Sequence, residues 1–214
     1  MKRVFARLIL SAVIILMAVP AFAHPHVYAD VRVQVQFDET GQVYAIDQQW
    51  LFDEFYSVFA TSGADMDGDG KPDQNALDAV LAENMSHLED YHYFTRVMSG
   101  DTRITTGKAT NATTRVIDNR LEMSFRLPVT APVAIRDMPL RYAIYDPTYY
   151  IEMVHAETDQ AITLVNAPTG CRAVMKQPNP DPEQIMLAAS LDRTQSAGDG
   201  LGQFFAEDVS LTCD

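Results

Sequence analysis

The sequence is poor in basic residues and in cysteine, and several common enzyme signatures are missing from it. Its 16 Lys and Arg residues stand against 29 Asp and Glu residues, which gives a formal net charge of −13. Such an acidic surface repels nucleic acid, so we expect no nucleic-acid partner. The chain has no HExxH zinc-protease pattern, no glycine-rich phosphate loop and no recognisable Ser-His-Asp grouping. We therefore expect a protein that is not an enzyme.

Only one long apolar run is present, and it lies near the N-terminus. LILSAVIILMAV follows the basic residues Lys2, Arg3 and Arg7, and Ala21-Phe22-Ala23 fits the small-x-small cleavage pattern. A run of about a dozen apolar residues is too short to span a bilayer comfortably. We expect residues 1–23 to be a signal peptide that is cleaved after Ala23, with an uncleaved anchor as the alternative. The mature chain, residues 24–214, should then be exported, form a single domain and have no stable membrane insertion.

The two cysteines, Cys171 and Cys213, are widely separated in the chain. In an oxidising compartment a lone pair of cysteines most simply forms one disulfide, which here would attach the C-terminal segment SLTCD to the body of the fold. Two soft metal ligands are the alternative, although neither cysteine belongs to a CxxC-type pair.

Hydropathy patterns predict a mainly β (α+β) protein, an antiparallel β-sandwich with a two-helix EF-hand-like insertion at about residues 52–91. Strict alternation predicts a strand in HVYADVRVQVQFD, and QVYAIDQQWLF returns as its hairpin partner. Helical spacing then appears twice, first in Phe52, Phe55, Tyr56 and Phe59, and again in Leu77, Leu81, Met85 and Leu88. A short helix is expected near Glu183–Ser190. The later candidate strands are YHYFTRVM, RLEMSFRLPV, PLRYAIYD, YYIEMVHA, AITLVN, CRAVMK and EDVSLTC.

An acidic loop between the two expected helices matches much of an EF-hand calcium loop. Asp65, Asp67, Asp69 and Asp73 occupy positions 1, 3, 5 and 9, Gly70 permits the sharp turn, and the Lys71 carbonyl would be the ligand at position 7. Two departures predict weak calcium binding: position 12 is Ala76 instead of a bidentate Glu, and position 8 is Pro72. Water, Asp78 or Glu83 are candidates for the missing ligand, and a solvated acidic turn is the alternative reading.

The histidines suggest a second metal site. Cleavage after Ala23 would give His24 a free amine beside its imidazole, and His26, two residues along a strand, projects from the same face. Three nitrogen donors suit Cu²⁺, Ni²⁺ or Zn²⁺. Pro25 has no amide hydrogen, which excludes a square-planar site built on a deprotonated amide at residue two. His155 is the best candidate to complete the site, although an ordinary surface or hydrogen-bonded histidine is the favoured reading of this residue.

The chain resembles one family of exported bacterial proteins in HPHV, QQWLFDEFYS, DMDGDG, HLEDYHYFT, YDPTYYIE and LGQFFAEDVSLTC. This family is catalogued as the domain of unknown function one-thousand-and-seven and is described as the periplasmic component of an uncharacterised ABC-type transport system. Its members often accompany nickel/cobalt-type or zinc permeases. The resemblance implies a periplasmic location and a link to transition-metal traffic, and it implies no activity.

Two functions of different classes follow from these observations. The leading hypothesis is a periplasmic transition-metal-binding accessory protein that captures Ni, Co, Zn or Cu and delivers the ion to an inner-membrane permease or ABC-type transporter. The alternative is a calcium-stabilised structural or adaptor domain without transition-metal binding. A copper oxidase with a histidine brace is a third reading, which requires a second placed histidine and a flat aromatic surface.

Overall fold

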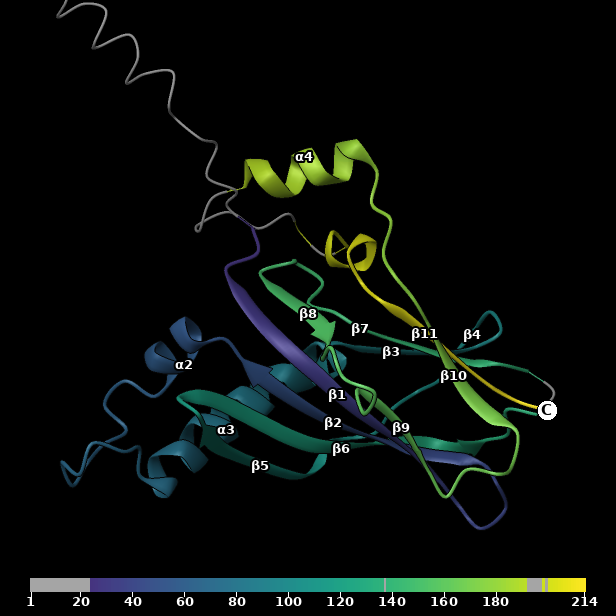
Figure 1. Cartoon of the computed structure of the whole chain (residues 1–214), viewed down its shortest axis with the longest axis horizontal. Helices are drawn as coiled ribbons and strands as arrows, with labels where there is room; N and C mark the ends of the chain where they lie inside the picture. Colours follow the sequence, from purple (N-terminus) through teal and green to yellow (C-terminus); the bar gives the residue numbers. More distant parts are fainter. Residues whose placement is uncertain (1–23, 137, 192–197, 199) are drawn as a thin grey trace, which may run out of the picture.

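The protein is built mainly from β-strands that form two open sheets (Figure 1). A computed structural model describes residues 24–136, 138–191, 198 and 200–214, so the expected signal peptide, residues 1–23, lies outside the described residues. The first sheet has the strand order β5-β6-β2-β1-β8, and β9 also pairs with β1. Its strands are β1 (Val27–Phe37), β2 (Val43–Phe52), β5 (Thr110–Ile117), β6 (Arg120–Val133), β8 (Ile151–His155) and β9 (Ile162–Val165).

The second sheet has the order β10-β11-β7-β3-β4, and all of its neighbouring strands are antiparallel. Its strands are β3 (Thr95–Ser99), β4 (Thr102–Arg103), β7 (Leu140–Ile144), β10 (Cys171–Lys176) and β11 (Asp208–Cys213). The expected disulfide is confirmed: Cys171 and Cys213 face each other in the register of β10 and β11 and are bonded. It closes a loop with a sequence separation of 42 residues and joins the edge strand β10 to β11, the last strand of the chain.

The expectation of a mainly β fold is confirmed, but the expectation that its strands are antiparallel holds only in part, because β8 and β9 both run parallel to β1. Hydropathy alternation predicts that a segment is a strand, but it carries no information about the direction of the neighbouring strand. The predicted strand YHYFTRVM is also too long. Only its second half forms β3, and a short turn, His92–Phe94, takes the place of the first half. The strands β4 and β5 were not predicted.

The two sheets contribute to one hydrophobic core, which explains the alternation in the strands. Alternate residues of β1, such as Val31 and Val33, are almost fully buried, as is Trp50 on β2. Leu140, Tyr142, Val209 and Leu211 of the second sheet belong to the same cluster. A buried polar contact also links the sheets: Gln48 accepts a hydrogen bond from Trp50 Nε1 at 3.0 Å and donates one to Thr95 Oγ1 at 2.9 Å.

The helices also appear where the sequence predicts them. They are α2 (Glu54–Ala60), α3 (Gln74–Asp90) and α4 (Pro182–Ser190), and α2 and α3 flank the acidic loop. Phe52, however, ends β2 instead of beginning the first helix, and the side chains of Phe55 and Phe59 are exposed. The helix α3 uses Leu77, Leu81 and Leu88 to pack on the core. Within the described part of the chain, no helix combines the length and the apolar character that a membrane span requires.

Candidate metal sites

The two N-terminal histidines lie side by side where β1 begins. The ring centroids of His24 and His26 are 4.6 Å apart, and the ring of Tyr150 is 5.0 Å from that of His26. The segment is anchored to its neighbour, because the backbone N–H groups of His26 and Val27 both donate to the carbonyl oxygen of Tyr150. His24 is buried, and its Nδ1 is 3.4 Å from the carbonyl oxygen of Leu191, just after α4. The sequence predicts the pair, but it gives no sign that Tyr150 joins it.

His155, the third expected ligand, is not brought to this pair. In the parallel register of β1 and β8, Val27 lies opposite Ile151 and Val31 lies opposite His155. At about 3.3 Å per residue, His155 is therefore about 13 Å along the strand from Val27, and His26 is further away still. The expected three-residue histidine site is thus separated into a pair and a distant third member.

Both ring nitrogens of His155 take part in a buried hydrogen-bond network. Its Nδ1 is 2.7 Å from Glu207 Oε2, which also accepts from the backbone N–H of His155, and its Nε2 is 3.1 Å from the Tyr142 hydroxyl. Gln177 donates to the other carboxylate oxygen of Glu207 at 2.7 Å. Burial, with a contribution from the charge of Glu207, raises the pKa of Tyr142, so its hydroxyl remains protonated beside Nε2. Neither nitrogen is left for a metal ion, so His155 is a hydrogen-bonded histidine of the core and not a metal ligand.

Glu207 is the member of this network that sequence reasoning did not identify. Burial alone raises the pKa of its carboxyl group, but hydrogen bonds from the ring and backbone of His155 and from Gln177 oppose this, and the net pKa lies below its ordinary value. Glu207 and His155 are 52 residues apart in the chain. No local pattern connects residues at that separation, so only the fold reveals the pair.

The acidic loop brings three of its four aspartates together. Carboxylate oxygens of Asp65, Asp67 and Asp73 all lie within 4.8 Å of one another. The loop is shaped by backbone N–H groups that donate to these carboxylates: Gly68 and Gly70 donate to Asp65 at 2.7 and 3.0 Å, and Met66 donates to Asp73 at 2.7 Å. Oxygen atoms gathered in this way are the ligand type that a hard cation such as Ca²⁺ requires.

The remaining expected ligands of the loop are placed less favourably. Asp69 is not in the cluster, and its carboxylate accepts from the backbone N–H of Lys71 at 2.8 Å. Ala76 lies within the first turn of α3, so it supplies no oxygen from its side chain at position 12. Asp78, a candidate for the missing ligand, accepts a hydrogen bond from Gln74 at 2.8 Å instead. The arrangement offers three clustered carboxylates, and calcium binding by the loop stays a prediction.

Comparison with known proteins assigns the chain to a family. The family described as "Protein of unknown function (DUF1007)" matches residues 9–213, so the chain belongs to it. An uncharacterized protein of Haemophilus influenzae (strain ATCC 51907 / DSM 11121 / KW20 / Rd) is 25% identical over 195 residues, which cover 90% of this chain and 92% of that protein. An uncharacterized 15.5 kDa protein in the trpE 3′ region of Spirochaeta aurantia is 28% identical over 90 residues, which cover 42% of this chain and 64% of that protein. No solved structure matches the chain.

Proposed function

We propose that this protein is a periplasmic accessory protein that binds a transition-metal ion and delivers it to an inner-membrane permease or ABC-type transporter, without catalysing a reaction. The observation that carries the proposal is the pairing of His24 and His26, whose rings are 4.6 Å apart at the start of β1. The disulfide adds support for export, because such bonds persist in oxidising compartments such as the periplasm.

The chemistry of the proposed site depends on cleavage after Ala23. The amine released at His24 would join the imidazoles of His24 and His26, and three nitrogen donors of this kind suit Ni²⁺, Co²⁺, Zn²⁺ or Cu²⁺. Anchoring of the strand at Tyr150 holds the two rings together before the ion arrives. With His155 engaged elsewhere, the remaining coordination positions are open to water or to a ligand from the transporter, which favours transfer of the ion.

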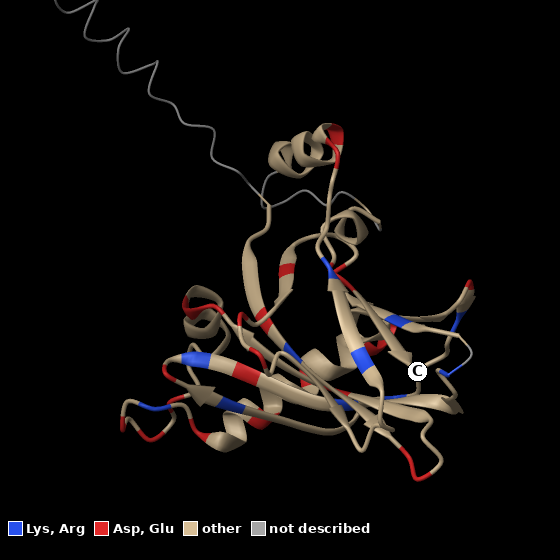
Figure 2. Ribbon diagram, turned by 45° about the vertical axis from the view of Figure 1, so that its right-hand side comes forward, with Lys and Arg blue, Asp and Glu red and all other residues tan. Residues whose placement is uncertain are grey.

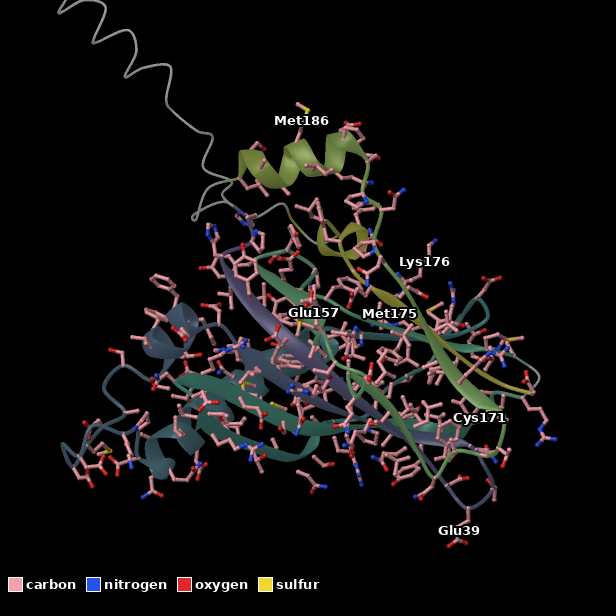
Figure 3. The ribbon with its side chains drawn as sticks, in the orientation of Figure 1. Glu39, Glu157, Cys171, Met175, Lys176 and Met186 are labelled. Carbon is pink, nitrogen blue, oxygen red and sulfur yellow. A yellow bond between two sulfur atoms is a disulfide. The ribbon has the colours of Figure 1, made fainter. Side chains whose placement is uncertain are left out.

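The surroundings of the histidine pair suit contact with a second protein. The helix α4 ends one residue before Leu191, whose carbonyl oxygen contacts His24. This helix exposes Ile185, Met186 and Leu187, and Met186 is 71% exposed and points away from the sheets (Figure 3). Exposed apolar side chains next to a binding site are typical of interaction surfaces. We propose that the transporter contacts α4 when it receives the ion.

Titration calorimetry with Ni²⁺, Zn²⁺ and Cu²⁺ tests this function on protein whose first residue is His24. Loss of a residue that hydrogen-bonds to a metal ligand lowers metal affinity by about tenfold to a hundredfold. His24 and His26 are proposed as ligands themselves, so His24→Ala and His26→Ala should each lower the affinity at least that much. An added N-terminal alanine should weaken binding as well, because it displaces the amine. His87→Ala, on the exposed side of α3, is the matched control. Unchanged affinity in the His24 and His26 variants would overturn the assignment.

The acidic loop supports a second candidate function, a calcium-stabilised structural or adaptor domain. Its geometry favours an EF-hand-like insertion into a β-sandwich, in which an ion held by Asp65, Asp67 and Asp73 would join the ends of α2 and α3. This function needs no transition metal. Stabilisation by Ca²⁺ together with no binding of Ni²⁺, Zn²⁺ or Cu²⁺ would select it over the first proposal.

A further inference from the structure

The second sheet carries a strongly basic exposed face on an otherwise acidic protein. Residues opposite each other on neighbouring strands project from the same face. Arg96 lies opposite Ala143, and Met98 lies opposite both Arg141 and Arg103, while the alternate residues Val97 and Tyr142 are buried in the core. The side of the sheet turned away from the core therefore holds a set of exposed basic residues, here called the basic face: Arg96, Arg103, Arg141, Arg172 and Lys176. In Figure 2 the ribbon is blue at the Lys and Arg positions, including those on the strands of this sheet.

A groove opens on this face in two adjoining hollows of about 240 and 400 Å³, which share Arg96, Tyr145 and Gln203 as lining residues. Arg141 lines the first hollow and Arg103 the second. These volumes are in the range of sites for small molecules. The groove also contains aromatic rings, among them Tyr91 and Tyr145, and one carboxylate in each hollow, Asp208 and Asp90.

The three arginines of the groove have no partner among the residues that the structure describes. Arg115, Arg120, Arg126 and Arg172 each form an ion pair with a carboxylate. Across the described ranges, Arg96, Arg103 and Arg141 take part in no ion pair and no side-chain hydrogen bond. Guanidinium groups offer planar, paired donors that match carboxylate and phosphate groups. Three of them line one groove in a chain of net charge −13.

The backbone beside the groove is strained. His92, Tyr93 and Phe94 have φ angles of 52°, 54° and 54°, a conformation that residues other than glycine rarely adopt. Such strain persists only where the surrounding structure enforces it, and it concentrates at functional sites. Here Thr95 Oγ1 donates to the carbonyl oxygen of Tyr93 at 2.7 Å, and Trp50 stacks on Phe94 at a ring distance of 6.0 Å. The buried core thus holds His92 and Phe94 at the rim of the second hollow.

Three segments that are distant in the sequence meet at the groove: HLEDYHYFT, YDPTYYIE and LGQFFAEDVSLTC. Close packing fixes their arrangement, because the backbone N–H of Tyr145 donates to the carbonyl oxygen of Phe94 at 2.8 Å. A side chain at Gly202 would collide with the carbonyl oxygen of Asp146, so only glycine allows the Gly202–Phe204 turn to approach and to place Gln203 in the groove. The residues that line the groove are different from those of the two candidate metal sites.

We propose that this groove binds a small anion with two or more carboxylate or phosphate groups, held by Arg96, Arg141 and Arg103. The spread of the guanidinium groups over two hollows matches a ligand whose charges lie at separate ends, and the tyrosines pack against its body. The site is independent of the histidine pair and of the acidic loop.

Titration calorimetry with citrate and with inorganic phosphate, in metal-free buffer at constant ionic strength, tests the proposal on the purified protein. Loss of one charge-assisted hydrogen-bonding group should weaken binding about tenfold or more. Arg96→Gln and Arg141→Gln should show this loss. Arg172→Gln is the matched control, since it removes the same charge from the same face outside the groove and should change the affinity less than about twofold.

The two probes distinguish the possible sources of the ligand. Binding of citrate with little binding of phosphate identifies a polycarboxylate, and the reverse identifies a phosphate compound. Absence of binding by both probes at 10 mM, or an equal loss in Arg172→Gln, would overturn the proposal. Circular dichroism of each variant shows that the fold is retained. His24→Ala should bind the anion as the parent does, so this result separates the groove from the proposed metal function.

Discussion

The α2–α3 insertion and the basic face of the second sheet are opposite in charge and in construction. Residues 53–90 contain ten acidic residues and one basic residue, whereas the basic face carries five basic side chains. The insertion is shaped by backbone N–H groups that donate to exposed carboxylates. The sheet beneath the basic face is held by a disulfide, the buried hydrogen-bond network of His155 and Glu207, and the core. The net charge of −13 is therefore distributed unevenly, with one strongly acidic region and one basic region.

The largest expected effect is a loss of stability when the disulfide of the second sheet is removed. Replacement of both Cys171 and Cys213 by serine removes the covalent link between β10 and β11 and should lower the free energy of unfolding by about 2–4 kcal/mol. Urea denaturation monitored by circular dichroism measures the change. A reduced but unmutated sample is the control and should show a similar loss. No loss in either sample would contradict the view that the basic face rests on a covalently closed sheet.

The next largest effect is a pH-dependent loss of stability when the buried pair of Glu207 and His155 is broken. Glu207→Gln should lower stability by about 2 kcal/mol at pH 7, because the charged hydrogen bonds with His155 are lost. Hydrogen bonds hold the pKa of Glu207 below its ordinary value of 4.5 in the folded state, so its contribution is present above pH 4.5 and disappears as the pH falls through the folded pKa.

Urea denaturation of the parent and of Glu207→Gln at several pH values between 7 and 3 measures this dependence. The difference in stability between the two proteins should shrink as the pH falls. Glu157→Gln, on an exposed position after β8, is the control and should show no such trend. A difference that is constant with pH would contradict the role assigned to the carboxylate.

A smaller effect is expected at the turn that places Gln203 in the groove. Gly202→Ala introduces a Cβ against the carbonyl oxygen of Asp146 and should lower stability by about 1–2 kcal/mol through overpacking. Thermal unfolding measures the loss, and Gln203→Ala at the exposed neighbour should leave stability nearly unchanged. If Gly202→Ala is equally stable, the groove is less tightly fixed than its packing indicates.

The smallest expected effect is a change in stability at the acidic loop of the α2–α3 insertion, and it should appear only when a cation is added. Ca²⁺ at tenfold above its dissociation constant would stabilise the protein by about 1.4 kcal/mol, and Asp67→Asn should reduce this stabilisation. Ala76→Glu supplies the missing ligand at position 12 and should raise the calcium affinity, whereas Ala76→Gln, the neutral control, should raise it less. Thermal unfolding with Ca²⁺ and with Mg²⁺ measures both. No response to Ca²⁺ in the parent or in Ala76→Glu would contradict calcium binding.

Local patterns in the sequence determine the strands β1 and β2, the helices α2, α3 and α4, and the acidic loop between two helices. They also indicate the disulfide, since a lone pair of cysteines leaves one intramolecular pairing. These features follow from hydropathy period, turn residues and composition, which act over a few residues.

Tertiary structure alone decides which distant residues meet. It places β8 and β9 parallel to β1, which carries His155 away from His24 and His26 and towards Glu207. It also gathers Arg96, Arg103 and Arg141, which show no pattern in the sequence, on one face of the second sheet. The physical reason is that strand pairing depends on how all strands share one buried core, a property of the whole chain that no local segment contains.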